Sequence, residues 1–250
     1  MKKDELVLFV VVAVLIIGSA LFLSLTKETA ITPQDIIKTE TGFERLEIPT
    51  QSSAIKVPAV DNEGNGVSTT LLVEAIPGKG RVLTNINQLL FWVDTQYSIR
   101  TAENVAQNIT KIDLTNIDLI YTIETNASII EGPSAGAALT VATIATLQNK
   151  TINPTVMITG TINPDGSVGP VGGILAKAKA SKDVGATLFL VPKGQSIQTN
   201  YVPVRQCQDI GPINYCSIEY KQERIDITKE AGITVKEVST IDEALKYFLV

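Results

Sequence analysis

A run of 20 residues without a single charged side chain lies near the start of the chain. It extends from Leu6 to Leu25 and reads LVLFVVVAVLIIGSALFLSL. A helix of about 20 residues spans about 30 Å, which matches the hydrocarbon core of a bilayer. Lys2 and Lys3 precede the run, and basic residues on that side favour a cytoplasmic start. The run predicts one transmembrane helix through residues 6–25, with the remainder of a single-pass protein on the external side of the cell membrane.

A cleaved signal peptide is the alternative interpretation of the same segment. Gly18, Ser19 and Ala20 are small enough to lie beside a cleavage site, although the apolar stretch of a signal peptide is usually shorter, about 7–15 residues. Residues 1–27 are therefore assigned as an anchor or a signal peptide. Both interpretations place the remainder of the chain outside the cytoplasm.

The composition excludes several classes of functional site. The chain contains no histidine, so it cannot build a Ser-His-Asp or Cys-His catalytic set or a His-ligated zinc site. Two cysteines cannot make a four-cysteine metal site, and a net charge of −5 gives no electrostatic footprint for nucleic acid. We expect no metal, no cofactor and no nucleic-acid partner. Any proton transfer must rest on a carboxylate, a lysine, a tyrosine or a terminal amine.

The segments after the apolar run predict a juxtamembrane linker over residues 28–57 and one folded domain over residues 58–250. Apolar and β-branched runs predict strands over 68–76, 117–125, 156–160, 187–191 and 233–238. Helical spacing predicts helices over 94–109, 134–147, 173–184 and 240–248. In the first of these helices the inward positions are expected to be Val93, Tyr97, Ala102, Val105 and Ile109. Strands and helices alternate with hairpins mixed in, which indicates a mixed α/β (α+β) fold.

Residues from about 193 to 230 show no clear period, and we expect an irregular insertion there. This segment holds both cysteines, Cys207 and Cys216. In an oxidising compartment the two could close a short loop as a disulfide. The alternative is a pair of unpaired thiols.

Ser134 is the first candidate for chemistry, because it stands at the predicted start of a helix. Helix N-termini present unpaired N–H groups and a partial positive charge, which could stabilise an oxyanion beside the hydroxyl. Pro133 stiffens the entry, and the small Ala135 and Gly136 leave room for a substrate backbone. The plainer interpretation is an ordinary serine N-cap, which is a common use of this residue.

A serine nucleophile needs a base, and without histidine a desolvated lysine can serve. The helix over 173–184 carries three lysines. At 100° per residue Lys177 shares a stripe with apolar and small residues, whereas Lys179 and Lys182 lie on a more solvated face. This pattern selects Lys177 as the buried lysine. The alternative is a lysine whose stem covers apolar surface while its ammonium reaches water.

The two candidates together carry a family resemblance. The segment EGPSAG, which contains Ser134, resembles the nucleophile motif of Lon-type Ser-Lys proteases. Thr159-Gly160 and the segment GPVGGILAK, which ends at Lys177, are similar to the lysine segment of that family, and the two motif residues stand 43 positions apart, as in the family. The similarity covers about residues 66–192 and resumes over 233–249.

The resemblance implies the Lon proteolytic-domain fold and roles for named residues. Ser134 would be the nucleophile, Lys177 the general base, and Thr159 a support that orients the lysine. Backbone N–H groups near the serine would form the oxyanion hole. Four motif neighbours would shape the site, namely Glu131, Gly132, Pro133 and Ala135. The family also implies polypeptide substrates and self-association into a homo-oligomeric ring.

Departures from the family narrow the expected activity. No Gly-Lys-Ser/Thr stands at Walker spacing, and Thr161 stands where many members carry a glutamate. The anchor resembles that of membrane-tethered archaeal relatives, which generally keep their ATPase. We therefore expect an ATP-independent serine endopeptidase that cleaves unfolded or small proteins. The alternative is a non-catalytic, membrane-anchored module that uses the same fold to bind peptides or to assemble.

Overall fold

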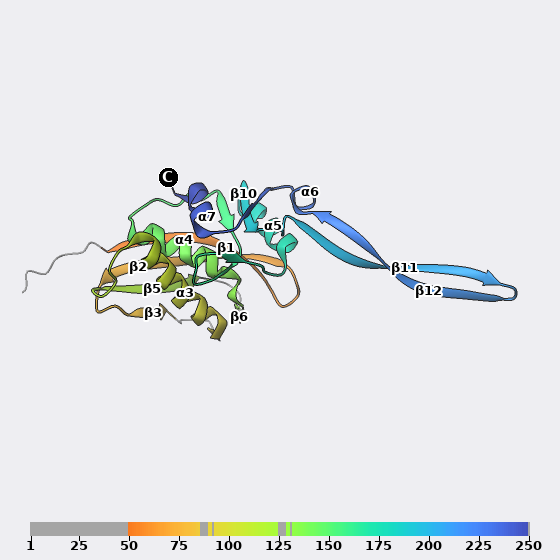
Figure 1. Ribbon diagram of the computed structural model, residues 1–250, viewed down its shortest axis with the longest axis horizontal. Helices are drawn as coiled ribbons and strands as arrows, with labels where there is room; N and C mark the ends of the chain where they lie inside the picture. Colours follow the sequence, from red (N-terminus) through yellow and green to blue (C-terminus); the bar gives the residue numbers. More distant parts are fainter. Residues whose placement is uncertain (1–49, 86–89, 92, 125–128, 131, 250) are drawn as a thin grey trace, which may run out of the picture. The chain divides into compact units, whose positions relative to one another are not determined.

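The computed structural model describes residues 50–85, 90–91, 93–124, 129–130 and 132–249 (Figure 1). The chain divides into two units, residues 1–47 and residues 48–250, and the described residues belong to the second. The predicted transmembrane helix or signal peptide and most of the predicted linker lie outside the described residues. Within these ranges no helix combines the length and the apolar character needed to cross a bilayer.

A four-stranded sheet forms one side of the domain, with the strand order β1-β2-β5-β3. The pairs β1–β2 and β2–β5 are antiparallel, and β3 runs parallel to β5. The strands are β1 (Gln51–Val60), β2 (Gly66–Pro77), β3 (Val82–Asn85) and β5 (Ile117–Glu124). Because β1 begins at Gln51 and pairs along its whole length, the predicted end of the linker at residue 57 is wrong.

A second sheet contains three parallel strands in the order β13-β10-β7. They are β7 (Val156–Ile158), β10 (Leu188–Pro192) and β13 (Thr234–Val238). Two short ribbons lie outside these sheets, one of β4 (Leu90–Phe91) with β6 (Ile129–Ile130) and one of β8 (Thr161–Ile162) with β9 (Val168–Gly169). These elements and the helices confirm a mixed α/β domain.

The helix α4 (Gly136–Leu147) is the centre of the larger hydrophobic core. All twelve of its residues are buried, and it contacts α3, α7 and the strands β1 and β2. Small and β-branched side chains let these neighbours approach from every side. The other helices are α3 (Val93–Thr110), α5 (Ile174–Asp183), α6 (Ile227–Ala231) and α7 (Ile241–Phe248). A smaller core cluster lies between α5, α6 and β10.

The predicted helix over 94–109 is present, but its inward face is partly wrong. Ala102 and Val105 are buried as expected, whereas Val93 is 78% exposed and Tyr97 is 61% exposed. The buried stripe instead follows Thr95, Ser98, Ile99, Thr101, Ala102, Val105 and Ala106. Two polar hydroxyls in this stripe reach the backbone carbonyl four residues earlier, which lets Ser98 and Thr101 face the core.

The segment expected to be irregular is a long antiparallel hairpin, and that expectation is wrong. Its strands are β11 (Ile197–Ile210) and β12 (Ile213–Asp226), drawn in cyan to blue in Figure 1. Most side chains on both faces are exposed, including the apolar Tyr201, Ile218 and Tyr220, and apolar residues alternate only over short stretches rather than along a whole strand. This is why the sequence pattern did not reveal the two strands.

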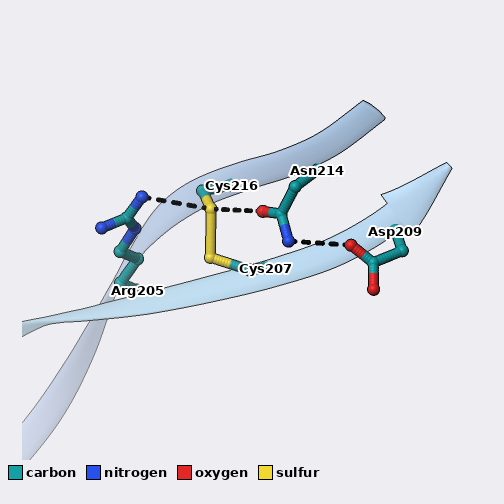
Figure 2. The surroundings of a disulfide bond; sticks show 5 residues. All are labelled: Arg205, Cys207, Asp209, Asn214 and Cys216. Carbon is teal, nitrogen blue, oxygen red and sulfur yellow. Dashed lines mark hydrogen bonds between the residues drawn. A yellow bond between two sulfur atoms is a disulfide. The ribbon is translucent and has the colours of Figure 1, made fainter. Parts of the chain in front are cut away.

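Cys207 and Cys216 form a disulfide bond across this hairpin (Figure 2). They stand directly opposite each other in the strand register, with their Cα atoms 4.0 Å apart. Arg205 donates a hydrogen bond to Cys216 Sγ over 3.3 Å, and Asn214 donates to the Asp209 carboxylate over 2.8 Å. The disulfide alternative of the sequence analysis is therefore the one found.

Asp118 is a fully buried carboxylate that fixes the loop between β2 and β3. One oxygen accepts the backbone N–H groups of Lys79 (2.7 Å) and Arg81 (2.9 Å), and the other accepts the Arg81 guanidinium. The Arg81 side-chain hydrogen bond, followed by the Lys79 backbone N–H, holds the pKa of the Asp118 carboxyl well below its usual range. The ionised form is therefore stabilised by folding.

We expect Asp118→Asn to lower the midpoint of urea or thermal unfolding at neutral pH, by several degrees in a thermal scan. A depressed carboxyl pKa contributes stability that is complete above about pH 4 and is lost as the pH falls. The gap between wild type and variant should therefore narrow below that pH. Equal unfolding midpoints at pH 7 would contradict this role for Asp118.

Candidate active site

Ser134 lies in a single 3-10 turn, η1 (Pro133–Ala135), that leads directly into α4. The turn is entered through Gly132, whose φ of 90° lies in the region that favours glycine. The next glycine, Gly136, has a packing role, since a Cβ there would lie 2.7 Å from Ile162 Cγ2. The space expected beside Gly136 for a substrate backbone is thus filled by Ile162 from β8.

The backbone carbonyl of Ser134 ties this turn to the end of β7. It accepts the Gly160 N–H over 3.0 Å and the Thr159 hydroxyl over 3.3 Å. In return, the Gly160 carbonyl accepts the Ala137 N–H from the first turn of α4. The serine is therefore held from both sides by the Thr159-Gly160 segment, which is 25 residues away in the sequence.

Lys177 is the buried lysine of α5, as the helical spacing predicted. It is 4% exposed, whereas Lys179 and Lys182 are exposed. The helix packs so closely on β2 that a Cβ at Gly66 would lie 2.1 Å from the Ala176 carbonyl oxygen. Burial lowers the pKa of the Lys177 amine to about 8, because the charged form is desolvated.

Thr159 lies between the two candidate residues and contacts both. It is fully buried, and its hydroxyl accepts a hydrogen bond from Lys177 Nζ over 3.4 Å while donating to the Ser134 carbonyl. One hydroxyl thus links the lysine amine to the serine turn. This geometry matches a side chain that orients a lysine.

Ser134 and Lys177 line the same cavity, whose volume is about 190 Å³. Most of the other lining residues are apolar or glycine, and a substantial share comes from β1. They include Val57, Pro58, Ala59, Val60, Leu71, Leu139, Gly172 and Gly173. Lys177 is the one ionisable side chain among the described lining residues. Such a cavity suits an apolar group of a ligand next to a hydroxyl and an amine.

Some backbone N–H groups around the serine already donate to carbonyl oxygens and are not available to stabilise an oxyanion. The Gly136 N–H donates to the Pro133 carbonyl and the Ala137 N–H to the Gly160 carbonyl. Donors to an oxyanion would therefore have to come from the Ala135 amide or earlier. Pro133 has no N–H and cannot be one of these donors. Of the four predicted motif neighbours, Gly132, Pro133 and Ala135 lie in or next to the serine turn, and Glu131 lies outside the described residues.

The contribution of β1 to the site was not predicted from the sequence, because residues up to 57 were assigned to a linker. The available signal was the alternation of Ser53, Ile55 and Val57, all of which are buried. Within the described ranges, no group of three or more acidic or cysteine side chains could hold a metal ion. The polar side chains that line this cavity are those of Ser134, Thr69 and Lys177, so its functional groups are two hydroxyls, an amine and backbone amides.

Comparison with known proteins gives a consistent family. Residues 69–223 match the model of the Lon protease (S16) C-terminal proteolytic domain. A Lon protease of Metamycoplasma arthritidis is 28% identical over 163 residues, which is 63% of this chain and 19% of that protein. An archaeal Lon protease of Thermoplasma volcanium is 27% identical over 132 residues, or 52% of this chain and 20% of that protein.

A third relative, a Lon protease of Clostridium acetobutylicum, is 32% identical over 139 residues, or 54% of this chain and 18% of that protein. The matched part of this chain thus spans about a fifth of the length of these curated relatives. The similarity concerns their proteolytic domain.

Proposed function

Since the chain belongs to the family of Lon protease (S16) C-terminal proteolytic domains, we propose that it is a serine endopeptidase with Ser134 as nucleophile and Lys177 as general base. The observation that carries the proposal is a buried lysine amine that lines one cavity with the serine and is joined to its turn through Thr159. A neutral amine is required of a base, and burial favours that form.

The proposed reaction needs only the groups of this cavity. The neutral Lys177 amine takes the proton from Ser134 Oγ, which attacks the carbonyl carbon of the scissile peptide bond. Backbone amides at the serine turn stabilise the oxygen anion that forms. The Lys177 ammonium then gives its proton to the leaving amine, and an acyl-serine remains. Water, deprotonated by the same amine, hydrolyses the ester and restores Ser134.

The edge strand β1 supports an extended polypeptide as substrate. Among the described strands β1 pairs only with β2, so its other edge has no strand partner in the described part of the chain, and its residues 57–60 line the cavity. An extended peptide can add to such an edge through main-chain hydrogen bonds while alternate side chains enter pockets. Peptides of unfolded or small proteins meet this requirement without prior unfolding.

Independence from ATP and attachment to a membrane are part of the proposal. The first rests on the sequence, in which no Walker motif is found. The second rests on the apolar run over residues 6–25, and the disulfide bond of the hairpin supports an oxidising, external compartment. Assembly into a homo-oligomeric ring remains a proposal from the family resemblance.

The test uses the full chain in detergent, without nucleotide. We expect a fluorophosphonate probe to label Ser134 and an unstructured protein such as casein to be cleaved. The non-catalytic alternative, a peptide-binding or assembly module, predicts casein binding without cleavage and no labelling. Peptide mass spectrometry of the labelled chain identifies the modified residue. Labelling of any serine other than Ser134, with cleavage intact, would refute the proposed nucleophile.

We expect Thr159→Val to reduce kcat/KM for a peptide substrate by about 10- to 100-fold. Valine keeps the shape of threonine but removes the hydroxyl that contacts Lys177 Nζ and the Ser134 carbonyl. Thr159→Ser retains that hydroxyl and is the matched control, with activity close to wild type. Equal rates for the valine and serine variants would show that the hydroxyl does not orient the lysine.

A further inference from the structure

A glycine loop, Val171-Gly172-Gly173, forms a thin wall beside the proposed catalytic cavity. Gly172 and Gly173 line that cavity together with Ser134 and Lys177. They also line a second hollow of about 320 Å³, whose other walls include Gln195 and the start of β11. The loop therefore has the proposed catalytic groups on one side and Gln195 on the other.

The side-chain amide of Gln195 holds this loop at both backbone groups of one residue. Gln195 Oε1 accepts the Val171 N–H over 3.0 Å, and Gln195 Nε2 donates to the Val171 carbonyl over 2.8 Å. This double hydrogen bond is the exchange that a hydrogen-bonded pair makes in an antiparallel sheet. It fixes both the position and the orientation of the Val171 peptide groups.

The loop needs such an external partner because its own sequence is flexible. Two successive glycines impose little conformational restriction. Gly173 adopts the left-handed conformation with φ 69°, and a Cβ there would lie 2.7 Å from Val60 Cγ2 at the end of β1. A small displacement of the loop would therefore change its approach to β1 and the shape of the cavity.

The same loop starts the helix that carries the proposed base. Gly173 is the N-cap of α5, and its carbonyl accepts the Lys177 N–H over 3.0 Å in the first helical turn. The Lys177 backbone is thus hydrogen-bonded directly to the last residue of the glycine loop. A displacement of Val171 would therefore act on the first turn of α5, which holds the Lys177 backbone.

Gln195 itself stands on a fixed base. Its backbone N–H donates to the Pro192 carbonyl at the end of β10. The next residue, Ser196, donates its N–H and its hydroxyl to the Glu237 carboxylate of β13, over 3.0 Å and 2.6 Å. Two strands of the parallel sheet therefore support the residue that holds the loop.

We infer that Gln195 is a positioning residue of the proposed active site. By holding Val171 at both backbone groups it fixes the glycine loop that walls the cavity and begins the helix of Lys177. The inference rests on the proposed function for its catalytic meaning, but the placement of Lys177 can be measured without catalysis.

The pKa of the Lys177 amine can be measured, and it reports how far the amine is buried. Burial is the cause of the lowered pKa of Lys177, and no charged side chain on α5 or on the elements packed against it contributes. Those charged groups are Lys56, Glu74, Lys179, Lys182, Asp183, Lys229 and Glu230. A loosened loop admits water to the amine, which returns its pKa toward the ordinary lysine value of about 10.4.

The test replaces Gln195 with methionine in the full chain, since methionine has a similar length and no amide. The pH dependence of acetic anhydride labelling, measured for each lysine by peptide mass spectrometry, reports the apparent pKa of Lys177. We expect Gln195→Met to move that value upward from about 8 and to lower kcat for a peptide about tenfold. The pH midpoint of the activity should rise together with the labelling midpoint.

Gln198→Met is the matched control, because Gln198 lines the same hollow but its side-chain amide donates to Asn200 Oδ1 over 2.9 Å and not to Val171. A merely structural role for Gln195 predicts less folded protein but an unchanged labelling midpoint for Lys177 in the folded fraction. That outcome would overturn the inference, as would an equal shift of the Lys177 midpoint in Gln198→Met. An inactive wild type would refute the proposed function instead, since the labelling experiment does not depend on turnover. The exposed Lys179 is an internal reference in every sample.

Discussion

Replacing Ser134 with alanine is expected to abolish peptide hydrolysis, with a loss in kcat/KM of at least about 10³-fold and up to about 10⁶-fold. The substitution removes the one hydroxyl among the described cavity residues that stands at the start of a buried helix. The turn should keep its shape, because the Ser134 backbone carbonyl accepts the Gly160 N–H and the Thr159 hydroxyl, and both bonds remain in the alanine variant. Casein cleavage and the turnover of a fluorogenic peptide measure the effect.

The matched control for this change is Ser52→Ala, which removes a hydroxyl from an exposed position on β1. It should leave kcat/KM and the unfolding midpoint unchanged. The Ser134→Ala variant should also unfold at the wild-type midpoint. Cleavage by Ser134→Ala at the wild-type rate would exclude Ser134 as the nucleophile.

Replacing Lys177 with methionine is expected to produce an equally inactive protein, with a loss of about 10³-fold or more. Wild-type activity should rise with pH through a midpoint of about 8, because only the neutral amine accepts the serine proton. The residual activity of the methionine variant should not show that midpoint. A wild-type rate that is flat between pH 6 and 10 would contradict the assignment of Lys177 as base.

The same substitution should increase stability while it removes activity. Burial lowers the pKa of Lys177, so at neutral pH the folded state holds a charged amine that it disfavours relative to the unfolded chain. This penalty is fully present below about pH 8 and disappears as the pH rises toward the ordinary lysine value, since the unfolded chain binds the extra proton in that interval. Wild-type stability should therefore rise with pH across this range.

Urea unfolding of the two proteins measures this effect directly. At pH 7 Lys177→Met should unfold at a higher urea concentration than wild type, by a few kcal/mol in the free energy of unfolding. Lys179→Met is the matched control, because Lys179 is exposed on the same helix and forms a 3.6 Å ion pair with Glu230. A lower unfolding midpoint for Lys177→Met would show that the buried amine stabilises the fold through contacts that outweigh its desolvation.

Helical periodicity is sufficient to predict from the sequence which lysine of α5 is buried. Lys177 shares its face with small and apolar residues, and the structure buries that face. The same reasoning failed at the start of α3, where Val93 and Tyr97 were expected inside. At this end of α3 the buried face includes Ser98 and Thr101, whose hydroxyls donate to backbone carbonyls of the same helix. A prediction based on the spacing of apolar side chains does not place such polar residues in the core.

Contacts between segments that are distant in the sequence could not be predicted from sequence patterns. The hairpin of β11 and β12 has no face turned to a core, and its apolar residues alternate only over short stretches, such as Val202 with Val204 and Ile218 with Tyr220. The contact of Gln195 with Val171 joins residues 24 positions apart through a neutral amide, which has no motif of its own. The bridge through Thr159 was expected only because of the family resemblance.

The ends of the hairpin meet at one point of the domain, and this has a consequence for engineering. Ile197 pairs with Asp226, and the Ile227 N–H donates to the Ser196 carbonyl over 3.0 Å, which closes the base of the ribbon. A segment whose entry and exit are adjacent can be shortened, exchanged or replaced by a foreign domain with little strain on its host. The outer part of the ribbon, from the Tyr201–Gln222 pair to the turn, is therefore a site into which an affinity tag or a reporter can be inserted. Gln195, the proposed catalytic groups and the Asp226 cap of α6 are then left in place.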